Sequence, residues 1–335
     1  MKAAVLDRYD KKGRDLNLRN VPVPEPNENE VLVKVHAAGV NPLDNMIVRG
    51  EVRLIVSYKT PLVMGNEFSG VVEKAGSGVS RFKPGDRVYG RMPLAKIGAF
   101  AEYAAIDQSA LAIIPEYLDY PEAATVPLTA LTAMQSFDIL QAQPGQTVFI
   151  SGGTGSFGSM AIPIAKKLGL HVVTSGSSSN RDRVLALGAD RFIDYKTEEY
   201  VQVVSDVDCV IDSLGESELV GQFGVLKEGG RLVSLRGLPN GRFAQRMGMS
   251  SFKKALFGIA GRKYDKMAAK KGQTYDFMFV REDGAQLDRI GQMFDSSSPL
   301  PTSVDAVYPL DQVNAAMEKV RVGRSRGKTV IGVSS

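Results

Sequence analysis

A glycine-rich loop is the clearest candidate for chemistry in this chain. Gly153, Gly155 and Gly158 follow the pattern G-x-G-x-x-G between an apolar run, residues 147–150, and a helix-like run, residues 160–168. In that setting the first glycine allows a tight turn, the second lets the backbone approach a pyrophosphate, and the third lets helix and strand pack closely. The loop therefore predicts a dinucleotide site, with an ordinary strand-to-helix loop as the alternative.

The segment after the next strand bears on which dinucleotide binds. Folds that select NAD usually place an Asp or Glu there to bind the ribose 2′-hydroxyl, but residues 174–181 read Thr-Ser-Gly-Ser-Ser-Ser-Asn-Arg. Gly176, Ser177, Asn180 and Arg181 favour a 2′-phosphate instead, because arginine binds phosphate through charge-assisted hydrogen bonds. We expect NADPH; the alternative is that the serines only cap a helix.

Size and composition limit the class of protein. A length of 335 residues predicts about two domains, and 44% apolar with 23% charged residues is typical of globular chains. The net charge of +4 is too small to indicate nucleic acid. A single cysteine, Cys209, excludes an internal disulfide and favours a reducing, cytoplasmic location. Since the N-terminus lacks a signal-peptide pattern and no apolar run reaches about 18 residues, neither secretion nor a membrane span is expected.

The chain shows two patterns of hydrophobicity. Residues 1–118 contain period-two alternation between frequent glycines and prolines, which predicts a compact β-rich region. From residue 145 onward, strand-like and helix-like runs alternate, which predicts a parallel sheet covered by helices on both faces. The last strand-like run of this series, residues 275–280, is expected at an edge of the sheet.

Residues 242–271 form a basic segment with interspersed apolar positions. Nine Lys and Arg residues face only Asp265, so the segment carries +8 and the rest of the chain −4. One interpretation is a basic amphipathic surface for an anionic ligand or a membrane. The other, which we favour, is a pair of solvated helices packed on the core.

Five separated motifs resemble the medium-chain dehydrogenase/reductases, and within them the zinc-independent quinone oxidoreductase and enone reductase branch, the zeta-crystallin-like proteins. They span residues 39–44 (GVNPLD), 61–72 (PLVMGNEFSGVV), 126–133 (VPLTALTA), 187–190 (LGAD) and 327–330 (GKTV). The resemblance covers almost the whole chain.

The resemblance implies an α/β protein in three segments. These are a GroES-like β-barrel catalytic domain over residues 1–118, a Rossmann cofactor domain over 119–294, and a C-terminal return to the catalytic domain over 295–335. The basic segment 242–271 is not part of the common family pattern, so its role stays open.

Zinc-dependent members of the family carry metal ligands at positions that here hold Asn41, Asn66 and Leu128. None of these is a good ligand, because Zn²⁺ prefers thiolate, imidazole or carboxylate. Both histidines, His36 and His171, lie in strand-like runs and are expected to be structural. We therefore expect no metal site.

The lack of metal ligands favours one type of hydride transfer. Alcohol oxidation requires loss of the hydroxyl proton, which a bound metal makes feasible near neutral pH. Hydride delivery to a quinone or an α,β-unsaturated carbonyl requires only donors near the oxygen that gains charge. We predict that Asn41 and Asn66 are these donors, with a structural role as the alternative. The competing functions are a zinc-dependent alcohol dehydrogenase and a non-catalytic NADPH-binding protein of crystallin type.

The remaining candidates are residues expected to contact the substrate or the cofactor. Met46 and Tyr58 are expected in an apolar substrate pocket, Tyr58 also being a weak candidate proton donor, while Asp44 and Glu67 brace the site. The resemblance places further residues against the cofactor: Asp44, Thr129, Thr132, Thr154, Ser156, Phe157, Tyr195, Ser213, Leu214, Leu235, Gly237, Met278, Phe279 and Arg324. By family analogy we expect a homodimer, paired through the edge strand 275–280, and no nucleic-acid partner.

Overall fold

The computed structural model describes residues 1–13, 15–323 and 327–333. The chain divides into two compact units, residues 1–131 together with 281–335, and residues 132–280. The boundary near residue 131 falls inside helix α3 (Pro127–Leu140), whereas the sequence-based boundary at 118/119 assigned this whole helix to the cofactor domain.

The first unit is built on β-sheets, as the alternating pattern of residues 1–118 predicted. Among the described residues, a three-stranded sheet has the order β2-β1-β4, and a seven-stranded sheet has the order β15-β16-β3-β5-β6-β8 with β7 paired to β3. The strands are β1 (Lys2–Leu6), β2 (Asn17–Asn20), β3 (Glu30–Val40), β4 (Leu62–Val63), β5 (Glu67–Ala75), β6 (Arg87–Arg91), β7 (Tyr103–Asp107), β8 (Leu111–Ile113), β15 (Val304–Pro309) and β16 (Lys328–Gly332).

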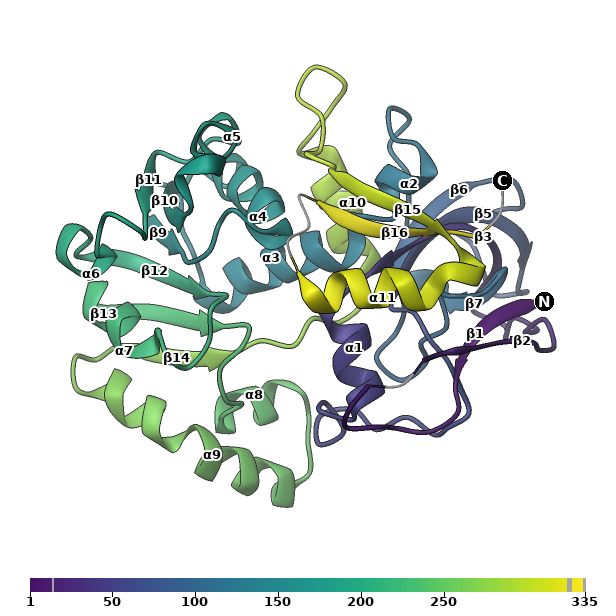
Figure 1. Cartoon of the computed structure of the whole chain (residues 1–335), viewed down its shortest axis with the longest axis horizontal. Coiled ribbons are helices and arrows are strands. Elements are labelled where there is room, and N and C mark those ends of the chain that lie inside the picture. Colours follow the sequence, from purple (N-terminus) through teal and green to yellow (C-terminus); the bar gives the residue numbers. More distant parts are fainter. Residues whose placement is uncertain (14, 324–326, 334–335) are drawn as a thin grey trace. The chain divides into compact units, whose positions relative to one another are not determined.

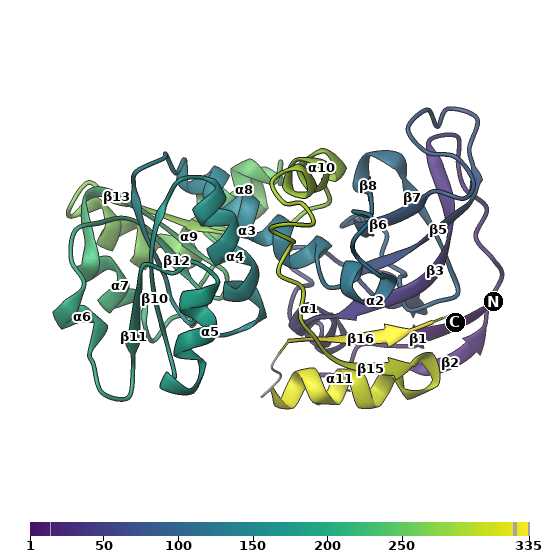
Figure 2. The same cartoon turned by 90° about the horizontal axis from the view of Figure 1, so that it is seen from above.

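The C-terminal segment completes the larger sheet. Strand β16 pairs antiparallel with β3, with Val330 opposite Gly39, so the end of the chain joins a strand near its beginning. Helix α11 packs along β15 and β16 in both views (Figures 1 and 2). The helices of this unit are α1 (Pro42–Arg49), α2 (Tyr120–Ala123), the start of α3, α10 (Gly284–Gln292) and α11 (Val313–Val322), with short 3₁₀ turns at η1 (Gln108–Ala110) and η3 (Leu310–Gln312).

The second unit is a doubly wound α/β fold. Its described strands form a parallel six-stranded sheet in the order β11-β10-β9-β12-β13-β14. The strands are β9 (Thr147–Ile150), β10 (His171–Gly176), β11 (Arg191–Asp194), β12 (Val207–Asp212), β13 (Leu226–Ser234) and β14 (Thr274–Phe277). The order reverses between β9 and β12, the type of point at which such sheets bind ligands. The predicted strands and their parallel arrangement are confirmed, and β14 lies at the edge as expected.

Helices connect these strands. They are α4 (Ser156–Lys167), the 3₁₀ turn η2 (Ser178–Asn180), α5 (Arg181–Ala186), α6 (Tyr200–Val203), α7 (Leu219–Val225), α8 (Gly241–Arg246) and α9 (Ser251–Ala269). Strands β9 and β12 are almost entirely buried, because helices on both faces of a parallel sheet exclude water from it. Among the described helices, none combines the length and hydropathy needed to cross a bilayer.

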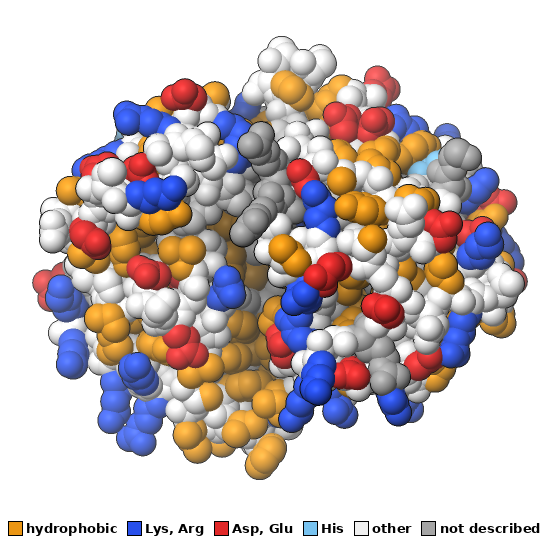
Figure 3. All heavy atoms as spheres, in the orientation of Figure 1, with side chains coloured by type: hydrophobic (Ala, Val, Ile, Leu, Met, Phe, Trp, Pro, Cys, Tyr) orange, Lys and Arg blue, Asp and Glu red, His pale blue; other side chains and the backbone are white. Residues whose placement is uncertain are grey.

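The basic segment folds into α8 and α9, which lie beside the edge strand β14 (Figure 1). Phe257 and Tyr264 are buried on one side of α9, as expected for a helix packed on the core. The opposite side leaves Phe252 and Ile259 with 78% and 75% of their surface exposed. Figure 3 shows Lys, Arg and hydrophobic side chains gathered over α9.

Candidate functional site

Asn41 lies at the start of helix α1, where strand β3 ends. Its backbone is extended and Pro42 occupies the first helical position, which suits proline because no N–H is needed there. The Asn41 backbone N–H donates to Asp44 Oδ2 at 2.8 Å, so the two residues form the reciprocal arrangement known as a capping box. This local motif fixes both side chains in the interior of the first unit.

The Asn41 amide is part of a buried polar network. Its Nδ2 donates to Glu67 Oε1 at 2.8 Å and to the Gly39 carbonyl at 3.3 Å. Its Oδ1 accepts from Lys328 Nζ at 2.6 Å. Both amide hydrogens are therefore used inside the protein, and this geometry suits a positioning role for Asn41 better than the donor role expected from the sequence.

Lys328 brings a buried positive charge to this network. Its Nζ lies 2.6 Å from Glu67 Oε1 and donates to Thr129 Oγ1 at 3.0 Å. In the sequence, Lys328 stands out only as part of the family motif 327–330, which implies no role for its side chain. A lysine at the start of an otherwise apolar strand can be exposed or buried, and the sequence alone does not show which.

Asn66 and Asp44 form the second part of the network. Asn66 Nδ2 donates to Asp44 Oδ1 at 2.7 Å, while Asn66 Oδ1 has no hydrogen-bond partner among the described residues. Complete burial raises the pKa of Asp44 to about 7, although hydrogen bonds from Asn41 and Asn66 act in the opposite direction. Asp44 therefore changes protonation state near neutral pH.

This set of side chains does not fit a zinc ion. The Asn41 amide is fully bonded, and the Glu67 carboxylate is held by Lys328 and by the Leu128 backbone N–H at 2.7 Å. An ammonium group between two oxygens repels a divalent cation. In the described part of the chain, no cluster of three or more His, Cys, Asp or Glu side chains is suitably placed for a metal. His36 stacks on Tyr120 with ring centroids 4.2 Å apart, a structural role as expected.

The predicted substrate residues also lie in the first unit. Tyr58 is buried, and its backbone N–H and carbonyl both bond to the Tyr9 hydroxyl, at 2.9 and 2.7 Å. Burial raises the pKa of the Tyr58 phenol to about 12, so this group remains protonated at neutral pH. Met46 is half-buried on α1. A further buried group near Tyr58, Arg91, was missed by the sequence analysis.

The glycine loop of the second unit has the geometry that a dinucleotide requires. A Cβ on Gly153 would lie 2.0 Å from Thr174 Oγ1, and one on Gly158 would lie 2.2 Å from the Gly153 carbonyl oxygen, so neither position accepts a side chain. Gly155 caps α4 without a side-chain hydrogen bond, and its Cβ position is open. The first N–H groups of α4, which include those of Ser156 and Phe157, are thus placed to receive a pyrophosphate.

Arg183, which was not predicted from the sequence, holds this loop in place. Its Nη2 donates to the Thr154 carbonyl at 2.6 Å and its Nη1 donates to Ser159 Oγ at 2.7 Å. The guanidinium therefore ties α5 to the glycine loop. The sequence does not show which of the two neighbouring arginines, Arg181 or Arg183, contacts the loop.

The expected 2′-phosphate residues gather where β10 and β11 end. Ser177 precedes the turn η2, Asn180 caps α5 and Arg181 begins it with an exposed side chain. The Tyr195 N–H donates to the Gly176 carbonyl at 3.2 Å, and the Tyr195 side chain is 59% exposed. Hydroxyl, amide and guanidinium groups are therefore concentrated at the carboxyl edge of the sheet, where Ser177 and Asn180 also hydrogen-bond to Ser179.

The other cofactor candidates of this unit follow the neighbouring strands. Ser213 Oγ donates to the Ser151 carbonyl at 2.6 Å. The Gly237 N–H donates to Ser234 Oγ at 2.7 Å, and the Met278 N–H to the Ser234 carbonyl at 3.0 Å. Leu235 comes directly after β13, and Leu214 and Phe279 are the second residues after β12 and β14. Thr132 lies on α3, and Arg324 lies outside the described residues.

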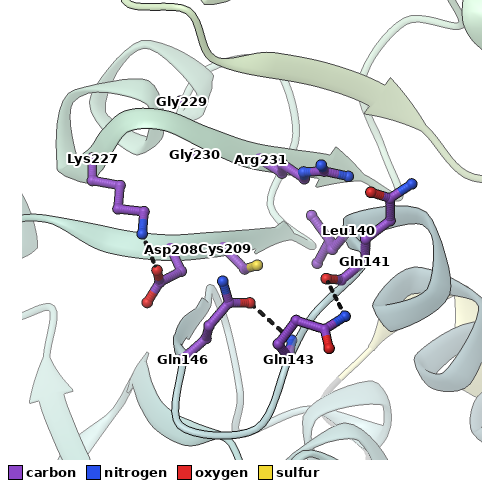
Figure 4. Close-up of a pocket in the computed structure, with 10 residues that line it drawn as sticks. All are labelled: Leu140, Gln141, Gln143, Gln146, Asp208, Cys209, Lys227, Gly229, Gly230 and Arg231. Carbon is purple, nitrogen blue, oxygen red and sulfur yellow. Dashed lines mark hydrogen bonds and ion pairs between the residues drawn. The ribbon is translucent and has the colours of Figure 1, made fainter.

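A separate pocket of about 340 Å³ lies at the opposite edge of the sheet. Figure 4 shows Asp208 and Cys209 from the start of β12, with Lys227 from β13 and glutamines from the loop after α3. Because ligands of such sheets bind at the carboxyl ends of the strands, this pocket is not the dinucleotide site. Burial raises the pKa of the Cys209 thiol to about 12, so the thiolate is scarce here.

Comparison with known proteins shows the family to which the chain belongs. An alcohol dehydrogenase GroES-like domain model matches residues 27–116, and a zinc-binding dehydrogenase model matches residues 187–331. The chain is 31% identical to the zebrafish (Danio rerio) NAD(P)H oxidoreductase RTN4IP1, mitochondrial, over 99% of this chain and 91% of the relative. It is 35% identical to 2-methylene-furan-3-one reductase of Solanum lycopersicum, over 93% and 74%.

Solved structures agree with this result. The quinone oxidoreductase from Coxiella burnetii superposes with a TM-score of 0.83 at 28% identity, covering 100% of this chain and 99% of that one. The chain belongs to the medium-chain dehydrogenase/reductase family of oxidoreductases, as its five motifs predicted.

Proposed function

We propose that this enzyme is an NADPH-dependent reductase of quinones and α,β-unsaturated carbonyl compounds that works without a metal. The observation that carries the proposal is the buried Lys328 ammonium between Asn41 and Glu67. Asn41 stands at one zinc-ligand position of the zinc-dependent relatives, and Glu67 directly follows another, Asn66. The names of the tomato and Coxiella relatives support the acceptor class.

The network supplies polarity without a Lewis acid. Bound NADPH supplies the hydride, and negative charge then develops on the oxygen of the acceptor. Thr129 accepts a hydrogen bond from Lys328, so the Thr129 hydroxyl keeps its own hydrogen for a further acceptor. Tyr58 stays protonated at neutral pH and Asp44 is partly protonated, so both groups carry a proton there.

The choice of NADPH over NADH rests on the carboxyl edge of the second unit. Ser177, Asn180 and Arg181 present hydroxyl, amide and guanidinium groups after β10, in the position where NAD-selective folds place an acid. The NAD(P)H in the name of the zebrafish relative supports a nicotinamide cofactor without choosing between the two.

Assembly and location complete the proposal. Among described strands, β14 pairs only with β13, although the Tyr275 and Phe277 carbonyls accept hydrogen bonds from Asn240 and Arg246. By family analogy we propose a homodimer that pairs through this edge strand. The single, buried Cys209 is compatible with a reducing compartment, and we propose the cytoplasm. Sedimentation of the purified protein tests the first point, and a monomer at micromolar concentration would contradict it.

The function is tested by turnover. The purified enzyme is assayed with NADPH and NADH against small quinones, enones and alcohols, and its metal content is measured. We expect oxidation of NADPH by quinones or enones, no oxidation of alcohols, and unchanged rates after treatment with a chelator. About one zinc per chain, with chelator-sensitive alcohol oxidation, would replace the proposal by an alcohol dehydrogenase. Tight NADPH binding without any turnover would favour a non-catalytic protein.

A further inference from the structure

Arg91 ends strand β6 as a completely buried arginine, with 0% of its side chain exposed. It is the direct cross-strand partner of Glu67 on β5. Paired residues of antiparallel strands project from the same face of the sheet. The Arg91 side chain therefore leaves the sheet next to that of Glu67, whose carboxylate binds Asn41 and Lys328.

The hydrogen bonds of Arg91 are incomplete. Nη1 donates to the Met92 carbonyl and lies 3.6 Å from Glu282 Oε2. Nε and Nη2 have no hydrogen-bond partner among the residues that the structure describes. Burying a cation with unmet donors is unfavourable, and such groups in a native fold call for an explanation.

Neighbouring acids do not satisfy these donors. Glu67 is held by Lys328, Asn41 and the Leu128 N–H. Glu282 is 31% exposed, and its Oε2 already accepts from the Leu94 N–H at 3.0 Å. Burial lowers the pKa of Arg91, but a guanidinium remains protonated in proteins. The first unit therefore contains the buried positive charge of Arg91, with Nε and Nη2 unpaired among the described residues.

The positions of the two free nitrogens indicate what they bind. Nε and Nη2 lie along one edge of the planar guanidinium, so their N–H bonds point in nearly parallel directions. This arrangement matches the two oxygens of a carboxylate, which arginine binds through two parallel hydrogen bonds. A single carbonyl oxygen would use only part of this edge.

We propose that Arg91 is a specificity-determining residue that binds a carboxylate on the substrate, so that the preferred acceptors are quinones or enones with an acidic side group. This inference rests on the proposed reductase function and adds the substrate class. The Arg91 charge acts on the buried Tyr58 phenol, and Tyr58 keeps its proton at neutral pH.

The test compares acids with their neutral analogues. Benzoquinones bearing a carboxylate on one, two or three methylenes are assayed with NADPH, each beside its methyl ester. Wild type should prefer at least one acid over its ester. Arg91→Met should lower kcat/KM for that acid at least about tenfold, equivalent to about 1.4 kcal/mol, and change the ester less than about twofold. Arg91→Lys keeps the charge but lacks the two-pronged edge, so it should fall between these.

Controls separate binding from structure. Arg81→Met removes an arginine of the same unit that pairs with Asp288 at the surface, and it should leave the acid-to-ester ratio unchanged. The thermal midpoint of Arg91→Met should equal or exceed that of wild type, because an apolar side chain replaces an incompletely bonded buried cation. The saturating free acid should raise the midpoint of wild type but not of Arg91→Met.

The outcomes are distinguishable. If esters are reduced but the acid-to-ester ratio is the same in wild type, Arg91→Met and Arg91→Lys, the inference is overturned and the reductase function stands. A lower midpoint in both Arg91→Met and Glu282→Gln, with an unchanged ratio, would assign Arg91 to a structural ion pair. If neither acids nor esters oxidise NADPH, and the acids stabilise wild type and Arg91→Met equally, the reductase function and the inference both fail.

Discussion

The Lys328 ammonium and the Glu67 carboxylate form a buried ion pair at 2.6 Å that joins the last strand of the chain to the middle of its N-terminal sheet. Lys328 lies at the start of β16 and Glu67 at the start of β5, and β3 lies between these two strands in the sheet. Fewer than one tenth of either side chain is exposed, so water screens this pair little.

Breaking this pair should destabilise the protein strongly. Lys328→Met leaves the Glu67 charge buried without its counter-ion, and we expect a loss of about 3–5 kcal/mol in the free energy of unfolding. The double variant Lys328→Met, Glu67→Gln should recover part of that loss. Lys74→Met, which breaks the exposed pair with Glu25, should cost less than about 1 kcal/mol. Urea unfolding measures all three, and equal losses for Lys328 and Lys74 would contradict the prediction.

Asp44 should make stability depend on pH. Its pKa is about 7 in the folded protein and 3.8 in the reference state, so the folded protein retains a proton that the unfolded chain has released. This contribution to stability is complete below about pH 4 and is lost as pH rises through about 7. The free energy of unfolding should fall by up to about 1.4 kcal/mol per pH unit within that window.

The Asp44→Asn variant removes the titrating group, and its stability should be flatter between pH 4 and 7. Asn66 Oδ1 has no partner, so a rotated Asn66 amide can accept from the new amide group. Glu25→Gln, at an exposed position, should keep the wild-type slope. Urea unfolding at several pH values checks this, and a slope in Asp44→Asn equal to that of wild type would refute it.

Arg181 should decide between the two nicotinamide cofactors. Arg181→Ala removes an exposed guanidinium at the carboxyl edge, and we expect the Kd for NADPH to rise about tenfold, with a small change for NADH. Arg191→Ala removes an exposed arginine at the other end of β11 and should change neither affinity. Fluorescence titration with both cofactors is the measurement. Equal losses for NADPH and NADH in Arg181→Ala would disprove the assignment of the 2′-phosphate site.

Gly158 should tolerate no side chain. The Cβ in Gly158→Ala would lie 2.2–2.4 Å from backbone atoms of Gly153, which forces the loop to move. We expect loss of cofactor binding together with a lower thermal midpoint. Gly258→Ala, in α9 with no atom within 4 Å of the new Cβ, should be neutral or more stable by up to about 1 kcal/mol. Cofactor titration and thermal unfolding measure both variants, and normal binding in Gly158→Ala would contradict the loop assignment.

The sequence by itself determined the class of fold and the position of the cofactor loop. The alternation of apolar strands and amphipathic helices from residue 145 specifies a parallel sheet, because only buried strands tolerate such continuous apolar runs. Gly153, Gly155 and Gly158 are signals within one short loop. A Cβ on Gly153 or Gly158 would clash with Thr174 or with Gly153, whereas the Cβ position of Gly155 is open. Asn41 and Asn66 could be placed because the motifs around them are contiguous.

The tertiary structure decided which charged residues are buried and which groups they contact. Lys328 is 261 residues from Glu67 in the chain, and only the pairing of β16 with β3 brings them together. Arg91 and Lys328 read as ordinary basic residues near strand ends, because burial is a property of the whole fold and not of a short pattern. Arg183 and Arg181 likewise differ only in what surrounds them, so long-range packing alone assigns one to the loop and leaves the other exposed.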